Sequence, residues 1–129
     1  MTDLATHLAK LDIHLSRFRE TGILNLIGGR NVTGVEWFET RSPVDESLIA
    51  KVALGGAAEI DAAAKAAKAA FPGWAAMEGD KRKAILHRIA DLIEERAEEI
   101  ALCECWDTGQ AWRFMSKAAL RGAENFRFF

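Results

Sequence analysis

Two cysteines, Cys103 and Cys105, are the residues best suited to nucleophilic chemistry, and they lie two positions apart. In a helix this spacing directs the side chains to different faces, which prevents both a good disulfide and a zinc half-site. A catalytic thiolate also needs a neighbouring base and donors for an oxyanion. The acidic neighbours Glu104 and Asp107 raise a thiol pKa instead of lowering it. The sequence therefore predicts reduced packing cysteines and no catalytic residue.

Metal and phosphate chemistry have equally little support. His7 and His14 are separated by about 10 Å along a helix axis, so they cannot share a metal ion, and we expect exposed surface histidines. Gly28-Gly29 is followed by Arg30, without the strand and helix frame of a phosphate-binding loop. We expect a turn between strands there, and no cofactor-binding residue is predicted.

Composition indicates one small globular domain. The chain has 129 residues, of which 50% are hydrophobic and 28% are charged, and its net charge is -2. Basic residues gather near the C-terminus without a recognisable nucleic-acid-reading module, so we expect a solvated or partner-facing surface and no nucleic acid. No apolar run approaches the roughly 20 residues that span a bilayer. We therefore expect a soluble cytoplasmic protein that binds no membrane.

The elements that would position these residues begin with an amphipathic helix over residues 3–20, within a lead segment 1–22. Short apolar runs follow, and they predict antiparallel strands at Leu26-Ile27, Trp37-Phe38 and residues 48–54, with a turn at residues 43–46. The predicted fold class is mostly α with a small antiparallel β element.

Three further helices are predicted. An alanine-rich helix spans residues 57–70 and ends at Phe71 and Pro72. A single long helix runs from Asp80, as its cap, to Gly109, as its stop, with one apolar stripe along its length. A last helix runs from about Ala111 to the end of the sequence, and we interpret its final apolar turn as a cut or an opened partner surface.

The long helix carries four glutamates in its second half: Glu94, Glu95, Glu98 and Glu99. Like charges at this spacing destabilise a helix unless partners neutralise them. The pattern suits partners that lie outside this helix, and solvent screening is an equally supported alternative.

Several short sequence motifs, taken in their order along the chain, resemble motifs of the NAD(P)-dependent aldehyde dehydrogenase family. They are Ile27-Gly28-Gly29-Arg30, Phe38 to Pro43, Leu48 to Val52, Ala70 to Trp74 and Glu104 to Gln110. The last of these motifs, residues 118–126, is most similar to the branch of the family that oxidises a semialdehyde from aromatic-acid breakdown.

The resemblance implies that residues 23–129 form an incomplete N-terminal portion of the α/β cofactor-binding domain. A complete relative would oxidise an aldehyde to a carboxylate through a catalytic cysteine with NAD or NADP. The family's catalytic and dinucleotide-binding residues match no position here, so we expect this chain to be inactive alone and to bind no cofactor tightly.

The resemblance also implies one minor site, a structural monovalent cation. Its ligands would be backbone oxygens of Thr40 and Arg41 and the carboxylate of Asp107, since hard cations prefer oxygen. A helix-end hydrogen bond from Asp107 is the simpler alternative.

Two function hypotheses remain. In the first, the chain is part of an aldehyde dehydrogenase, and its partners are the remainder of the enzyme or other copies, bound through exposed apolar helix faces. In the second, the same faces make a non-enzymatic interaction or self-association module. Direct nucleotide binding is a thinner third possibility.

Overall fold

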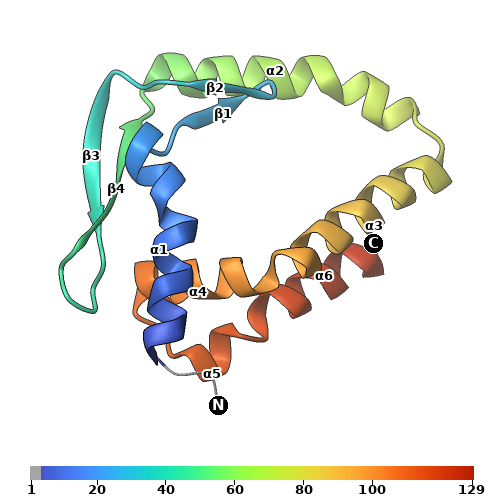
Figure 1. The fold of residues 1–129 in the computed structure, drawn as a ribbon. Coiled ribbons are helices and arrows are strands. Elements are labelled where there is room, and N and C mark those ends of the chain that lie inside the picture. The colour runs from blue at the N-terminus through green and yellow to red at the C-terminus, as the bar shows by residue number, and fades with distance from the viewer. Residues whose placement is uncertain (1–3) are drawn as a thin grey trace.

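The computed structural model describes residues 4–129 and contains mainly helices (Figure 1). The helices are α1 (Leu4–Thr21), α2 (Ala57–Ala76), α3 (Gly79–Glu95), α4 (Ala97–Thr108), α5 (Trp112–Met115) and α6 (Ala118–Phe128). The strands are β1 (Asn25–Ile27), β2 (Arg30–Val32), β3 (Glu36–Arg41) and β4 (Leu48–Leu54). The predicted fold class is confirmed. Asp3, which belongs to the predicted lead helix, lies outside the described residues.

Two antiparallel hairpins form the β element. Gly28 and Gly29 join β1 to β2 with φ of 57° and 77°, which confirms the predicted turn. β3 pairs with β4, and the register shifts between Thr40 and Arg41. Ile23 extends this sheet through a parallel bridge to Val52.

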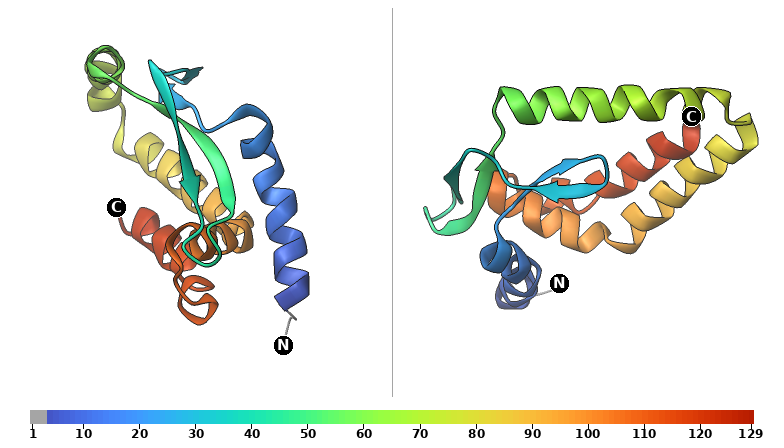
Figure 2. Two further views of the ribbon diagram at one scale, coloured as in Figure 1. Left: turned by 90° about the vertical axis from the view of Figure 1, so that its left-hand side faces the viewer. Right: turned by 90° about the horizontal axis from the view of Figure 1, so that it is seen from above.

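The principal core lies where α1, β4 and α4 meet, and α1 runs beside β4 (Figure 2). Because the register shift leaves Ile49 as an extra residue on β4, the usual alternation breaks and both Ile49 and Ala50 are buried. The core cluster consists of Leu11, Leu15, Ile49, Ala50 and Leu102.

The prediction of one long helix from Asp80 to Gly109 is wrong in one respect. The chain leaves helical geometry at Arg96, whose φ of -111° and ψ of 17° separate α3 from α4. The Arg96 N–H bonds to the carbonyl of Ile93, three residues back, instead of four. The bend lets α3 pack on α6 while α4 packs on α1.

Of the two predicted ends of the long helix, the structure confirms the C-terminal one and contradicts the N-terminal one. Gly109 ends α4, as predicted, and it adopts the left-handed conformation with φ of 72°. Asp80 does not cap α3, because the helix begins one residue earlier, at Gly79, and Asp80 lies in its first turn. There its carboxylate still suits the positive end of the helix dipole.

The alanine-rich helix α2 is longer than predicted, because it continues through Pro72 to Ala76. Proline removes one helical N–H, but α2 is exposed at this point, so water can replace the lost partner of the freed carbonyl. All of its residues are exposed or half-buried, and its main contact is with β1. In Figure 1, α2 crosses the top of the molecule apart from the other helices.

The last predicted helix is also divided, since α5 ends at Met115 and α6 begins at Ala118. The Lys117 N–H bonds to the carbonyl of Phe114, a short turn that redirects the chain. α6 then packs along α3, with Ala90 of α3 and Ala123 of α6 fully buried. Small side chains at this crossing permit close approach of the two helices.

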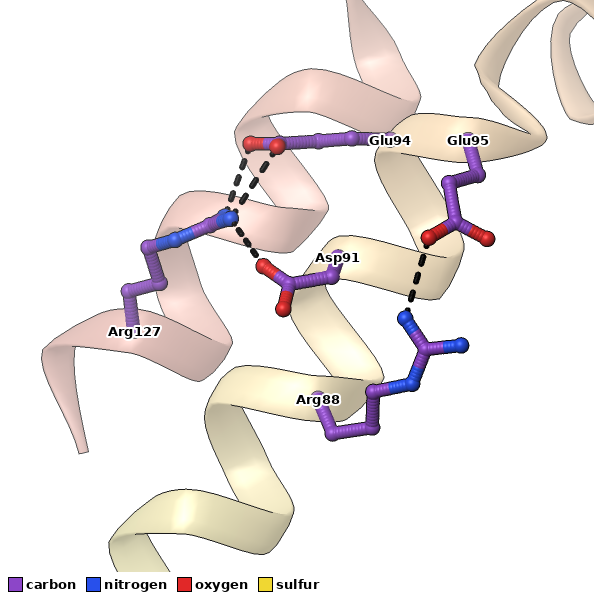
Figure 3. A network of polar contacts seen from close by, with 5 residues as sticks. All are labelled: Arg88, Asp91, Glu94, Glu95 and Arg127. Carbon is purple, nitrogen blue, oxygen red and sulfur yellow. Dashed lines mark hydrogen bonds and ion pairs between the residues drawn. The ribbon is translucent and has the colours of Figure 1, made fainter.

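The four glutamates of α3 and α4 find cationic partners within the chain. Arg127 of α6 bonds Asp91 at 2.6 Å and Glu94 at 2.7 Å, and Arg88 bonds Glu95 at 2.9 Å (Figure 3). The two glutamates of α4 form ion pairs with α1: Lys10 contacts Glu98, and Arg17 contacts Glu99. Partners outside the predicted helix thus explain most of the acidic pattern.

The expectation of two exposed histidines is wrong, since both are half-buried. The His7 ring packs against the Trp112 ring with centroids 4.5 Å apart. Among residues 4–129, no helix combines the length and apolar character needed to cross a membrane.

Candidate functional site

The candidate functional site is the junction between the β3–β4 hairpin and the C-terminal end of α4. Ser42 is its anchor, with 1% of its surface exposed. Its hydroxyl donates to the carbonyl of Trp106 at 2.8 Å and accepts from the Val44 N–H at 3.2 Å. One side chain therefore shapes the turn and ties it to α4. The sequence analysis missed Ser42, although a serine directly before Pro43 at the start of a turn is a usable signal.

Two of the three residues predicted to bind a cation, Thr40 and Asp107, lie together at this junction, although the contact is made by the Thr40 side chain and not by its backbone oxygen. The Thr40 hydroxyl donates to the Asp107 carboxylate across 3.3 Å, which joins β3 to the last turn of α4. The Arg41 guanidinium instead bonds the Glu39 carboxylate at 2.6 Å and the Glu46 carbonyl at 3.0 Å. A guanidinium cannot bind a cation, so only a backbone oxygen of Arg41 could serve as a ligand.

The donor chemistry of the junction suits a hard monovalent cation in part. One carboxylate and neighbouring strand oxygens are suitable ligands for a hard cation, but hard cations such as calcium and magnesium take about six or more oxygens, which is more than this junction supplies. Within residues 4–129, no group of three or more His, Cys, Asp or Glu side chains could hold a metal ion. The remaining ligands would have to be backbone oxygens, water or another part of a larger protein.

Thr40 and Asp107 also border a cavity of about 540 Å³ between α1, the sheet and the α3–α4 bend. Its wall is mainly apolar, with Phe18, Ile49 and Ile93 among the lining side chains. Arg17 and Arg96 both bond Glu99 at one side of this wall. The recess is therefore mainly apolar, and the charges at its side are paired, because Arg17 and Arg96 both contact the Glu99 carboxylate.

The two cysteines do not form part of a reactive centre. Burial raises the pKa of the Cys103 thiol above its ordinary value, and the negative charge of Glu99 raises it further. Burial likewise raises the pKa of Cys105, with a smaller contribution from Glu104. The predicted direction is confirmed, although burial is the larger cause. Both thiols are free and favour their protonated, less nucleophilic form.

Comparison with known proteins identifies the family to which this fold belongs. A model described as "Aldehyde dehydrogenase family" matches residues 31–129. The 5-carboxymethyl-2-hydroxymuconate semialdehyde dehydrogenase of Escherichia coli is 39% identical over 104 residues, which cover 80% of this chain and 22% of that enzyme.

Solved structures of similar proteins belong to the same family. The HpcC protein of Thermus thermophilus superposes with a TM-score of 0.88 at 37% identity, over 94% of this chain and 24% of that chain. The NAD+ complex of an aldehyde dehydrogenase from Bacillus cereus superposes with a TM-score of 0.82 at 34% identity, over 88% of this chain and 24% of that chain.

The chain belongs to the aldehyde dehydrogenase family, and its fold is the N-terminal part of the aldehyde dehydrogenase fold. It spans about a fifth to a quarter of the length of these relatives. Residues 31–129 carry the family match, so the lead helix α1 precedes the matched region.

Proposed function

We propose that this chain is the N-terminal scaffold segment of an enzyme that oxidises an aldehyde to a carboxylate with NAD or NADP. The substrate class proposed for the whole enzyme is a semialdehyde of aromatic-acid breakdown, since the relative in E. coli acts on 5-carboxymethyl-2-hydroxymuconate semialdehyde. The chain's own contribution is structural: it provides helices for the rest of the enzyme, lacks the catalytic machinery and is inactive alone.

One observation carries this proposal: 94% of the chain superposes on only 24% of the HpcC chain. The unmatched portion of such an enzyme is large enough to cover the surfaces that α2 leaves open. Ile60 and Phe71 of α2 are 68% and 65% exposed, so two large apolar side chains of this helix are left in contact with water. Contact with the remainder of an enzyme, or with other copies in an oligomer, would remove these side chains from water.

The cation site is proposed on the same basis. In the complete enzyme, backbone oxygens of Thr40 and Arg41 and the carboxylate of Asp107 would hold a structural monovalent cation. The Thr40–Asp107 contact supports this assignment because it places the strand beside the carboxylate. The ion would neutralise Asp107 and stabilise the β3–α4 junction.

An activity assay of the chain alone tests the proposed lack of catalysis. The purified chain is incubated with the semialdehyde and either NAD or NADP, and the formation of reduced cofactor is followed by absorbance. We expect no rate above that of buffer and no heat of cofactor binding by calorimetry. Aldehyde-dependent turnover, or tight binding of either nucleotide, would contradict the proposal.

A self-association module is the second candidate, and the same exposed apolar side chains favour it. Size-exclusion chromatography with light scattering separates the two functions. A discrete oligomer of the chain alone, with the α2 backbone protected from hydrogen exchange, would favour self-association. Concentration-dependent, heterogeneous association would favour a scaffold whose proper covering is the rest of an enzyme.

A further inference from the structure

The lead helix α1 has a mixed attachment to the rest of the molecule. Its apolar side packs Leu11 and Leu15 against Ile49 and Leu102, with 5% and 3% of the two leucines exposed. The neighbouring Phe18 lines the 540 Å³ cavity together with Cys103 of α4. α1 therefore forms one wall of the cavity and lies over the Cys103 side of α4.

Charged contacts set the position of this helix along α4. Lys10 bonds the Glu98 carboxylate at 2.7 Å, and Arg17 bonds Glu99. Glu99 also accepts a bidentate interaction from Arg96, at 2.8 and 2.9 Å, at the bend between α3 and α4. Lys10 and Glu98 remain 41% and 48% exposed, so salt in solution reaches and screens that pair.

α1 is joined to the sheet through a single glycine that can act as a hinge. Gly22 has φ of 74°, and its N–H bonds to the carbonyl of Phe18 to close the helix. A rotation at this residue would lift α1 without disturbing the strand bridge that begins at Ile23.

We propose that α1 is an electrostatically latched strap: Lys10–Glu98 and Arg17–Glu99 hold it against α4 beside the half-buried Cys103, and its release exposes the Cys103 thiol fully to solvent. The apolar seam supplies most of the attraction, and the ion pairs fix the register and adjust the closed population. The proposal is independent of the assignment of the chain to a larger enzyme.

Labelling of Cys103 measures the opening of the strap. The full chain with Cys105→Ala reacts with a small thiol reagent at constant pH, and its rate is normalised to the denatured chain. Between about 0.01 and 1 M salt the screening length falls from about 30 to about 3 Å, so we expect the rate to rise about two- to fivefold. Glu98→Lys at low salt should raise it about two- to tenfold, and adding Lys10→Glu should restore most of the protection.

Two controls test whether the change in labelling rate is specific to the release of α1. Glu95→Lys disrupts the Arg88–Glu95 pair on α3, away from α1, and should leave Cys103 labelling unchanged. The chain with Cys103→Ala reports on Cys105, which should not respond to salt or to Glu98→Lys.

Several outcomes would overturn the proposal. These are a Cys103 rate that ignores both salt and Glu98→Lys, a charge-swapped pair that gives no rescue, or equal acceleration of both cysteines. If circular dichroism shows that Glu98→Lys is unfolded, the salt series on the Cys105→Ala chain decides the matter by the same criteria.

Discussion

Ser42 connects two elements through a single buried hydroxyl. It donates to the Trp106 carbonyl and accepts from the Val44 N–H, so removing it leaves two backbone groups without their partner. We expect Ser42→Ala to lower the free energy of unfolding by about 1–3 kcal/mol, the cost of leaving two partly buried backbone groups without their hydrogen-bond partner. Urea denaturation measures this loss. Ser16→Ala is the matched control, because that exposed hydroxyl bonds only within its own helix, and an equal loss in both variants would contradict the anchoring role.

Glu46 has φ of 62°, the left-handed region in which a side chain is strained. Glycine relieves this strain but makes the unfolded chain more flexible, so the two effects partly cancel. We expect Glu46→Gly to raise the free energy of unfolding by about 0.5–1 kcal/mol. Thermal denaturation compares it with Glu36→Gly in the extended strand β3, which should be destabilising. A loss of stability in Glu46→Gly would show that the side chain contributes more than its strained backbone costs.

Sequence reasoning at this scale succeeded where residue type alone determines the outcome. Gly28-Gly29 form the predicted turn and Gly109 ends the helix as predicted, and the acidic neighbours indicated the direction of the thiol pKa shifts, to which burial adds the larger part. The role of Ser42 depends on Trp106, which lies far away in the sequence, and the packing of His7 on Trp112 has the same cause. Such contacts leave no periodic signal.

The crossing of α3 and α6 depends on small side chains. Ala90 and Ala123 are fully buried there, so a larger side chain must displace one helix from the other. We expect Ala90→Leu to lower the free energy of unfolding by about 1–3 kcal/mol through overpacking. Chemical denaturation tests this, with exposed Ala84→Leu on the same helix as the control. A neutral Ala90→Leu would mean that the two helices are not closely packed.

Glu99 makes the attachment of α1 and the bend sensitive to acid. Its pKa is lowered from the ordinary value of 4.5, chiefly by the hydrogen bonds from Arg96 and also by the charges of Arg17 and Arg96. Its stabilising contribution is therefore complete above pH 4.5 and is lost as the pH falls through the lower pKa of the folded state.

This sign gives a pH-dependent prediction for Glu99→Gln. At neutral pH the variant should be less stable than the parent by about 0.5–1 kcal/mol, a value reduced for the solvent-exposed arginines. On acidification below the ordinary pKa the difference should shrink toward zero. Denaturation at several pH values measures it, with exposed Glu104→Gln as the control. A difference that stays constant with pH would exclude an ionic role.

Element types were predictable from periodicity, but their interruptions were not. Arg96 breaks the long helix without a glycine or proline, and α2 continues through Pro72 where proline indicated an end. Packing explains the break at Arg96, because α3 must reach α6 while α4 reaches α1. Exposure explains the continuation of α2, because water can satisfy the carbonyl that Pro72 leaves without a partner.

For the whole molecule, the acidic pattern of α3 and α4 is the most instructive feature. The sequence left external partners and solvent screening as equal alternatives. The structure identifies partners in α1 and α6, with Arg88 and Arg96 contributing from the same helical region. The open faces of α2 have no such internal partner among residues 4–129, which agrees with a chain spanning about a fifth of its relative's length. The Thr40–Asp107 junction shows the same limit, since its proposed cation needs further ligands.

The most direct test of the scaffold role is a chimera. Residues of this chain replace the matched segment of the E. coli 5-carboxymethyl-2-hydroxymuconate semialdehyde dehydrogenase, with which they share 39% identity. The formation of NADH with the semialdehyde is then measured for the chimera and for this chain alone. The scaffold role predicts turnover by the chimera, which retains the enzyme's own remaining segments, and none by the chain. A folded chimera without activity, or turnover by the chain alone, would contradict it.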